Sequence, residues 1–275
     1  MPKSRLLALI ALSFALFMIA IAVVFGASNS FLSLEGLVIV VGGSIANAYL
    51  SYQREDVLKA FDTIKDLLNK TPSTRERLHK DIMQMIMWAY VVHARDFLGL
   101  EKETNDKLHD AFTRYGVDLV ITGYDSDKIR DMLHTVADAE FERCCAPVTV
   151  LRNMAATAPA FGMVGTLIGM VLIMKNIGMD MSSIGGGLAI AMLSTLYGIL
   201  MARLVCLPAA DKLLQKEEGE RFRNYMLTEG LAMLAEKQSP FYMQDKLNSF
   251  LEPAKHFSLN DYEQMALHRR FALAA

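Results

Sequence analysis

The sequence predicts an all-α membrane protein. Its four transmembrane helices form two hairpins, and a large helical cytoplasmic domain lies between the second and third. The 275 residues are 53% hydrophobic and 21% charged, so apolar and charged residues occupy separate stretches of the chain. Lysine and arginine are also distributed unevenly around the apolar stretches, which orients them across a membrane.

Four apolar windows are long enough to cross roughly 30 Å of hydrocarbon as helices. Short loops join the first window to the second and the third to the fourth, so each pair forms a hairpin. The predicted spans cover about residues 6–26, 34–50, 155–177 and 185–207. The predicted parts are hairpin 1 in residues 1–50, a cytoplasmic helical domain in 51–154, hairpin 2 in 155–207 and a cytoplasmic tail in 208–275.

The loops between paired spans, 27–33 and 178–184, contain no lysine or arginine, whereas cations are frequent in the rest of the polar sequence. The positive-inside rule therefore places both termini and the long middle segment in the cytoplasm. A secretory signal peptide is the alternative for the N-terminus, because KSR, an apolar run and FGAS imitate its three regions. The apolar run is longer than a usual signal core and a second one follows closely, which favours a retained span.

The middle segment and the tail read as helical. DVLKAFDTIKDLLN has apolar residues at a 3.6-residue period, which predicts a helix. Ser73 or Thr74 can cap a second helix, which contains DIMQMIMWAYVVHA. Asp125 or Ser126 can cap a third helix, which runs toward the third span. Ser239-Pro240 interrupts the tail. The formal net charge of -2 suggests no nucleic-acid partner.

Small residues recur at spacings of three and four on the third and fourth spans. In lipid, small residues let helices approach closely, so this pattern predicts a packing contact between the two spans. The residues expected to form it are Gly162, Gly165, Gly169, Ala191 and Gly198.

Three hydroxyls, Thr166, Ser194 and Thr195, lie among these small residues. Such hydroxyls commonly bond a carbonyl of their own helix and do nothing else. They can also replace part of the water shell of a permeant ion. The third and fourth spans contain no Asp or Glu, and Glu35 stands at the expected outer mouth of the second span. A chain that carries ions by reversible binding to a carboxylate would obtain that carboxylate from another protein.

Catalysis and metal binding have little support in the sequence. The glycine-rich stretches GGS and GMVGTLIG lack the lysine of a phosphate-binding loop, and the six histidines and three cysteines show no metal-ligand spacing. No nucleophile with a base, and no paired acids, occur in the spans. We therefore expect no enzyme activity, no resident metal and no cofactor.

The two span sequences APAFGMVGTLIGM and AIAMLSTLYGILMARLVCLPAADKL resemble the MotA/PomA family of bacterial flagellar stator subunits, within the MotA/TolQ/ExbB group, and closely its PomA-type branch. VIVVGGSIAN, FLGLE, YGVDLVITGYDSDKIRDML and EGLAMLAEKQSP extend the resemblance over most of residues 5–251. It implies a homopentamer in the bacterial inner membrane around a dimer of a single-span MotB/PomB-type B subunit. That subunit brings the ion-binding aspartate. Ion flow would turn the pentamer, which pushes on the rotor protein FliG.

The resemblance also assigns roles by position. Pro159 and Pro208 match the two prolines linked in the family to coupling ion flow with movement, although a proline also simply bends or ends a helix. Thr166 matches a threonine typical of sodium-type subunits, and Ser194 and Thr195 match a hydroxyl pair on the fourth span. The resemblance therefore favours Na⁺ over H⁺ as the permeant ion.

At the rotor surface the resemblance is less complete. Glu101 matches an acidic residue of the family's torque surface, but His93 occupies the position of the family's arginine, with Arg95 two residues further on. This departure keeps open an alternative, a MotA/TolQ/ExbB-type ion-powered unit that energises an envelope process other than the flagellum. The ExbB and TolQ branches usually have three spans, so the four predicted here argue against those two branches.

Overall fold

The computed structural model describes residues 33–65, 74–104, 110–175, 177, 181–253 and 256–257, with no side-chain description at 74–76 and 181–183. The predicted first span, residues 6–26, lies outside them. The described elements are the α-helices α2 (Leu34–Ser51), α3 (Arg54–Lys65), α4 (Thr74–Thr104), α5 (Ala111–Thr122), α6 (Ser126–Lys175), α7 (Met181–Leu200), α8 (Leu207–Ala235) and α9 (Pro240–Asn248), with a π-helix, η3 (Met201–Cys206), between α7 and α8.

The described chain is all-helical, as predicted, and three of its helical stretches are long and apolar enough to cross a membrane. They are Leu34–Ser51, Ser126–Lys175 and Ile184–Ala235. The last two extend well beyond the predicted spans, because α6 continues from a charged into an apolar sequence without a break and η3 joins α7 to α8. A polar helical stretch and an apolar, membrane-spanning stretch are thus continuous in α6, and also in α7, η3 and α8 taken together.

The chain divides into two compact units. The first unit comprises residues 1–67 and 147–211, and the second comprises 68–146 and 212–275, so α6 and α8 each contribute to both. The predicted divisions of the chain stood after residues 50, 154 and 207.

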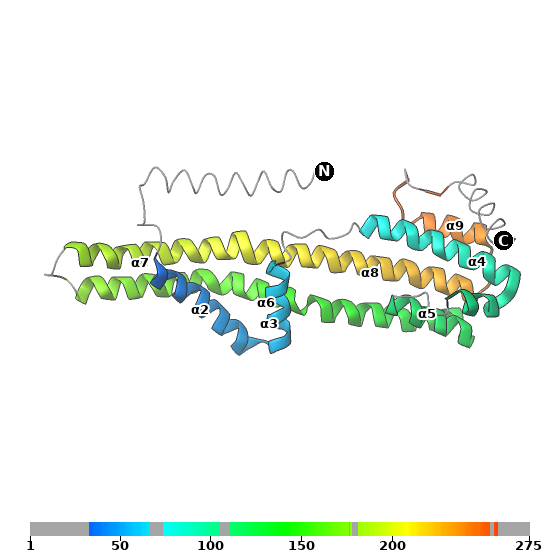
Figure 1. The fold of residues 1–275 in the computed structure, drawn as a ribbon, viewed down its shortest axis with the longest axis horizontal. Helices are drawn as coiled ribbons and strands as arrows, with labels where there is room; N and C mark the ends of the chain where they lie inside the picture. The colour runs from blue at the N-terminus through cyan, green and yellow to red at the C-terminus, as the bar shows by residue number, and fades with distance from the viewer. Residues whose placement is uncertain are drawn as a thin grey trace. The chain divides into compact units, whose positions relative to one another are not determined.

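In the first unit, α2 lies obliquely across the paired helices α6 and α7 (Figure 1). Ser33 caps α2, its hydroxyl accepting a hydrogen bond from the Gly36 N–H at 3.2 Å. The ring of Phe161 on α6 occupies the place that a side chain at Gly43 would take, so glycine is needed there. The far end of α2 is fastened by polar groups: the Asn47 amide donates to Asn153 Oδ1 at 2.9 Å, and the Asn153 amide donates to the Tyr52 hydroxyl at 3.2 Å.

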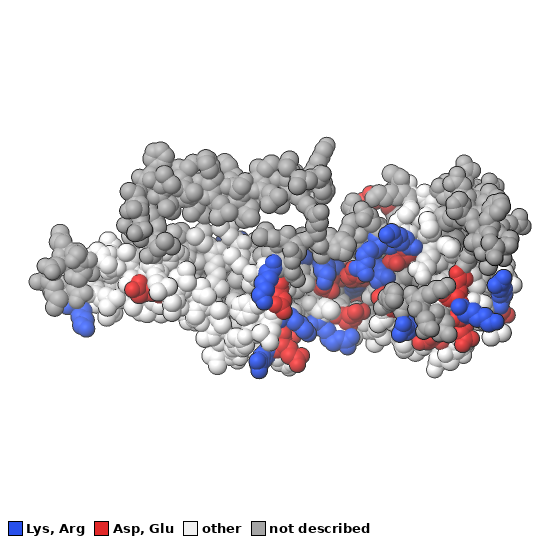
Figure 2. All heavy atoms as spheres, in the orientation of Figure 1, with Lys and Arg blue, Asp and Glu red and all other residues white. Residues whose placement is uncertain are grey.

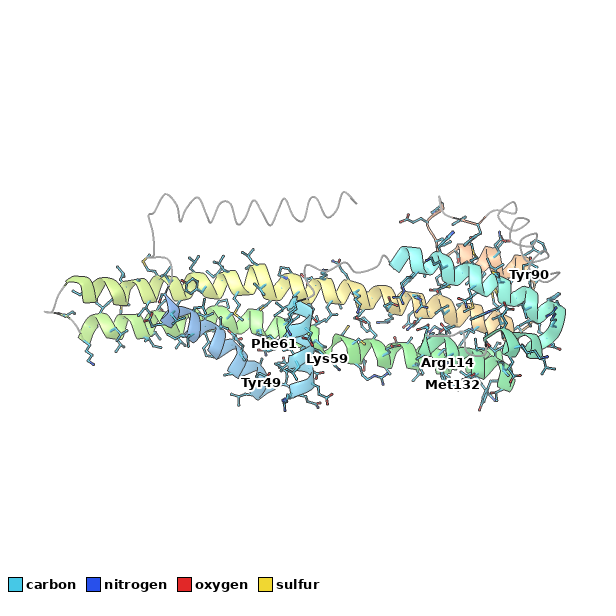
Figure 3. All side chains as sticks on the ribbon, viewed as in Figure 1. Tyr49, Lys59, Phe61, Tyr90, Arg114 and Met132 are labelled. Atoms are coloured by element: carbon cyan, nitrogen blue, oxygen red, sulfur yellow. The ribbon has the colours of Figure 1, made fainter. Side chains whose placement is uncertain are left out.

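The second unit has a hydrophobic core built from α4, α5, α9 and the portions of α6 and α8 that belong to it. Its largest fully buried side chains include Ile82, Leu133 and Leu231. Tyr90 of α4 and Met132 of α6 are partly buried against this core (Figure 3). On the face drawn in Figure 2, charged side chains gather over the helices of this unit and are sparse over α7.

Local sequence explains where the helices of the second unit begin and end. Asp110 caps α5 by accepting from the Thr113 N–H, and Gly123 ends it in a left-handed conformation (φ 84°), with its N–H bonded to the Val120 carbonyl. Ser239 caps α9 and Pro240 occupies its first position, where a missing N–H costs nothing. The predicted starts near Thr74 and Ser126 agree with α4 and α6, and the interruption predicted at Ser239-Pro240 separates α8 from α9.

Candidate functional site

The contact between α6 and α7 is made through small residues. A methyl group at Gly162 would lie 2.9 Å from the Ser194 carbonyl oxygen, and one at Gly198 would lie 2.6 Å from the Ala158 carbonyl oxygen. At Gly169 it would lie 2.8 Å from the side chain of Ala191. Any larger residue would force the two helices apart, so this surface is where they approach most closely.

Ser194 is fully buried in this contact. Its hydroxyl lies 3.1 Å from the Gly162 carbonyl oxygen across the contact and 3.1 Å from the Ala191 carbonyl oxygen of its own helix, and its one hydrogen serves either acceptor. Its side chain occupies the space above Gly165, which has no side chain of its own. The structure therefore gives Ser194 a role in holding α6 against α7.

Thr166 and Thr195 are partly buried, in contrast to Ser194. The Thr166 hydroxyl donates to the Met163 carbonyl oxygen at 2.6 Å, three residues earlier in α6. This bond uses the hydrogen and leaves the oxygen lone pairs free to accept. A hydroxyl oxygen held in this way can coordinate a cation without first breaking its own hydrogen bond.

Glu35 is the only carboxylate within the four predicted spans. A methyl group at neighbouring Gly36 would lie 3.4 Å from the Ser194 amide nitrogen, so α2 begins beside the part of α7 that carries the hydroxyl pair. The Ser33 hydroxyl donates to Glu35 Oε2 at 3.2 Å, and the Ser33 N–H donates to the Tyr197 hydroxyl at 3.1 Å. The start of α2 is thus fastened to α7.

The two prolines occupy different local structures. Pro159 lies inside α6, directly against Gly198 of α7. Pro208 follows η3, in which the Leu207 N–H bonds the Ala202 carbonyl oxygen five residues earlier. A proline ring clashes with the carbonyl four residues before it, and a wider turn relieves that clash. A cavity of about 550 Å³ adjoins both elements and is lined by Arg152, Ala156, Pro159, Ile199, Arg203 and Leu207, among others.

The predicted rotor residues lie on α4 of the second unit. His93, Arg95 and Glu101 are all exposed, and among the described residues neither Arg95 nor Glu101 forms an ion pair. The helix bends between them, because Asp96 has a non-helical backbone (φ 59°, ψ -168°). No residue pattern in α4 predicts this bend. Arg95 and Glu101 are therefore available to a partner, on opposite sides of the bend.

A buried arginine joins α4, the start of α5 and α8 within the second unit. Arg223 of α8 is 7% exposed and pairs with Asp81 of α4, with Asp110 at 3.1 Å and with Glu220 at 3.7 Å. Burial alone would raise the pKa of Asp110, but the Thr113 hydrogen bond and the Arg223 charge outweigh it and lower that pKa. This cluster was not predictable from the sequence, because its partners are far apart in the chain.

The chain is similar to known proteins over most of its length. Residues 104–249 match the MotA/TolQ/ExbB proton channel family. The chemotaxis protein PomA of Vibrio alginolyticus is 30% identical over 87% of this chain and 92% of its own length. Two solved structures share the fold at a TM-score of 0.77: the MotAB complex of C. jejuni (21% identity, 92% of this chain and 97% of the other) and the flagellar MotAB stator complex of Bacillus subtilis (23% identity, 90% and 96%).

The fold and its apolar helices define a multi-pass membrane protein with a MotA-like architecture. The chain belongs to the MotA/TolQ/ExbB proton channel family. This confirms the resemblance drawn from the span sequences. Channel proteins of this family are not enzymes, so the expectation of no catalytic activity is confirmed as well.

Proposed function

We propose that this chain is the A subunit of an ion-driven flagellar stator. Together with a B subunit it forms an ion channel and converts ion flow into rotation and torque on the rotor. The observation that supports the proposal is the packing of α6 against α7 within the two predicted spans, residues 155–177 and 185–207. Thr166 and Pro159 lie on α6 beside the glycine contact, and these two spans contain no carboxylate. Ion transfer at this pair requires an acid from a partner, as a B subunit would supply.

The assembly proposed is a homopentamer around a dimer of a single-span MotB/PomB-type subunit. It lies in the bacterial inner membrane, with four spans per chain and both termini in the cytoplasm. The distribution of lysine and arginine supports this orientation. Exposed Arg95 and Glu101 support a charged contact with FliG, since charges at an interface rim steer association and fix register.

Na⁺ is the proposed permeant ion, with H⁺ as the alternative. A proton needs only a hydrogen-bonded relay, whereas a sodium ion needs oxygen ligands that replace its water. Thr166 supplies such an oxygen, because its hydrogen is already donated within α6. Thr195 is partly buried on the neighbouring helix and is proposed to contribute in the same way, while Ser194 holds the two helices together.

Swimming speed tests this proposal in cells whose only stator is this chain and its B subunit. We expect speed to rise with sodium at fixed membrane potential, and Thr166→Ala to weaken that dependence. Thr157→Ala is the matched control, since Thr157 also bonds carbonyls of its own turn in α6 but lies outside the proposed path. Speed that ignores sodium and responds to a protonophore would establish H⁺ as the ion. Absence of motility would favour the non-flagellar alternative.

A further inference from the structure

Two non-glycine residues in the described part of the chain have positive φ angles, and they contact each other. They are Asp96 in α4 (φ 59°) and Lys237 after α8 (φ 52°). The Lys237 ammonium lies 2.7 Å from Asp96 Oδ1. Non-glycine residues rarely adopt positive φ angles unless contacts with their surroundings stabilise them. Such residues cluster at functional sites.

Asp96 has the more demanding conformation of the two. Its angles (φ 59°, ψ -168°) fall in a region that essentially only glycine occupies without strain. The Asp96 side chain is 60% exposed, so burial does not stabilise this backbone conformation. The carboxylate instead accepts two hydrogen bonds, one from the Lys237 ammonium and one from the Phe97 N–H at 3.1 Å. The Lys237 hydrogen bond lowers the pKa of Asp96, and the Phe97 bond acts in the same direction.

Lys237 is itself held by the end of α8. Its N–H donates to the Leu234 carbonyl oxygen and the next N–H, of Gln238, donates to Met233, both at 3.0 Å. This is the pattern that ends many helices, and its left-handed residue is usually glycine. A lysine at this position carries a side chain toward α4, where its ammonium also lies 4.9 Å from the centre of the Phe97 ring. One cation therefore contacts both residues at the bend.

The bend sets the relation between the two exposed charges of α4. Gly99, after the bend, lies against the side chains of Arg95 and Val91 before it: an added methyl would stand 2.6 Å from Arg95 Cβ. Arg95 and Glu101 are thus presented by two closely packed parts of α4, with Asp96 between them. We propose that Lys237 is a positioning residue for the rotor-facing surface, its ion pair with Asp96 fixing the bend that places Arg95 and Glu101. This rests on the proposed function of that surface.

A glycine substitution tests the proposal, because glycine adopts the Asp96 backbone without help. Amide hydrogen exchange is measured at residues 97–101 in the purified complex with the B subunit. We expect Lys237→Met to speed exchange there roughly two- to fivefold, the range of an exposed ion pair. Asp96→Gly is expected to leave exchange near wild type, and adding Lys237→Met to Asp96→Gly to change nothing further. Lys246→Met, an exposed lysine of α9, is the control.

Motility of the same variants separates this proposal from the function on which it rests. We expect lower torque in Lys237→Met and recovery in the double variant. Exchange could follow the expected pattern while neither Lys237→Met nor Glu101→Lys alters torque. In that case the Lys237–Asp96 ion pair does fix the bend in α4, but the proposed rotor role of the surface is wrong. If Lys237→Met leaves exchange unchanged, or speeds it equally with and without Asp96→Gly, the positioning role of Lys237 is overturned.

Discussion

At the scale of single residues, two neighbouring hydroxyl side chains on α7 have different surroundings. Ser194 and Thr195 are consecutive hydroxyls, yet Ser194 is fully buried against α6 and Thr195 is partly accessible. The family resemblance placed both in the predicted ion path, because spacing along the chain shows that two hydroxyls share a helix but not which of them faces a neighbouring helix. Ser194 faces α6 because the absent side chain of Gly165 leaves room for it, and this contact depends on the register of α6 against α7.

Gly165→Ala is expected to destabilise the first unit, whereas Gly42→Ala is expected to be nearly neutral. The added methyl at Gly165 would meet the Ser194 side chain, so the helices must separate, while the one at Gly42 meets nothing within 4 Å. Overpacking of this kind costs about 1–3 kcal/mol. Thermal unfolding in detergent measures both variants. Equal melting temperatures for the two would contradict the close approach of α6 and α7 at Gly165.

At the scale of helices, the Arg223 cluster determines how α8 is held against its neighbours in the second unit. Arg223→Met leaves the carboxylates of Asp81 and Asp110 without their buried cation. Removing one partner of a buried ion pair costs about 3–5 kcal/mol. Arg77→Met is the matched control: Arg77 pairs with Glu220 while 46% exposed, and an exposed pair contributes about 1 kcal/mol or less. Chemical denaturation measures both, and equal losses would contradict the burial argument.

The contribution of Asp110 gives this prediction a pH dependence. Because the pKa of Asp110 is lower in the folded protein than in the unfolded chain, its stabilisation is complete above the unfolded pKa of about 4. It is lost as the pH falls through the lower folded value. The difference in stability between wild type and Arg223→Met should therefore shrink between about pH 5 and pH 3. A difference that grows over this range would contradict the assignment.

The helices themselves were predictable to different degrees. Hydropathy located α2 and the apolar parts of α6 and α7, capping residues located the starts of α4 and α6, and Ser239-Pro240 located the break between α8 and α9. The continuation of α6 and α8 across the unit boundaries was not predicted, because a helix that is polar in one half and apolar in the other reads as two elements. Pro208 marks a disturbance of the helix but not its form, a π-helix in residues 201–206, and the bend at Asp96 left no sequence signal because contacts distant in the chain hold it.

At the scale of the whole molecule, the two predicted spans in residues 155–177 and 185–207 carry the hydroxyls of the proposed ion path but no Asp or Glu. We expect liposomes with this chain alone to show no ion flux above empty liposomes, and flux to appear when a B subunit is included. The reason is that an ion carried by reversible binding needs a carboxylate, and here a partner would provide it. Flux measured with ion-sensitive dyes decides this, and conduction by the chain alone would contradict the proposal.

The last described residue also takes part in the fold of the second unit. Phe257 stacks on the ring of His79 at 4.2 Å, and its backbone is held at both polar groups: its N–H donates to Asn248 Oδ1, and its carbonyl accepts from the Gln244 and Asn248 amides. A deletion that stops before this residue would uncover the start of α4 and leave two buried amides without partners. A fluorescent tag for counting stators in a living cell should therefore be attached after residue 257.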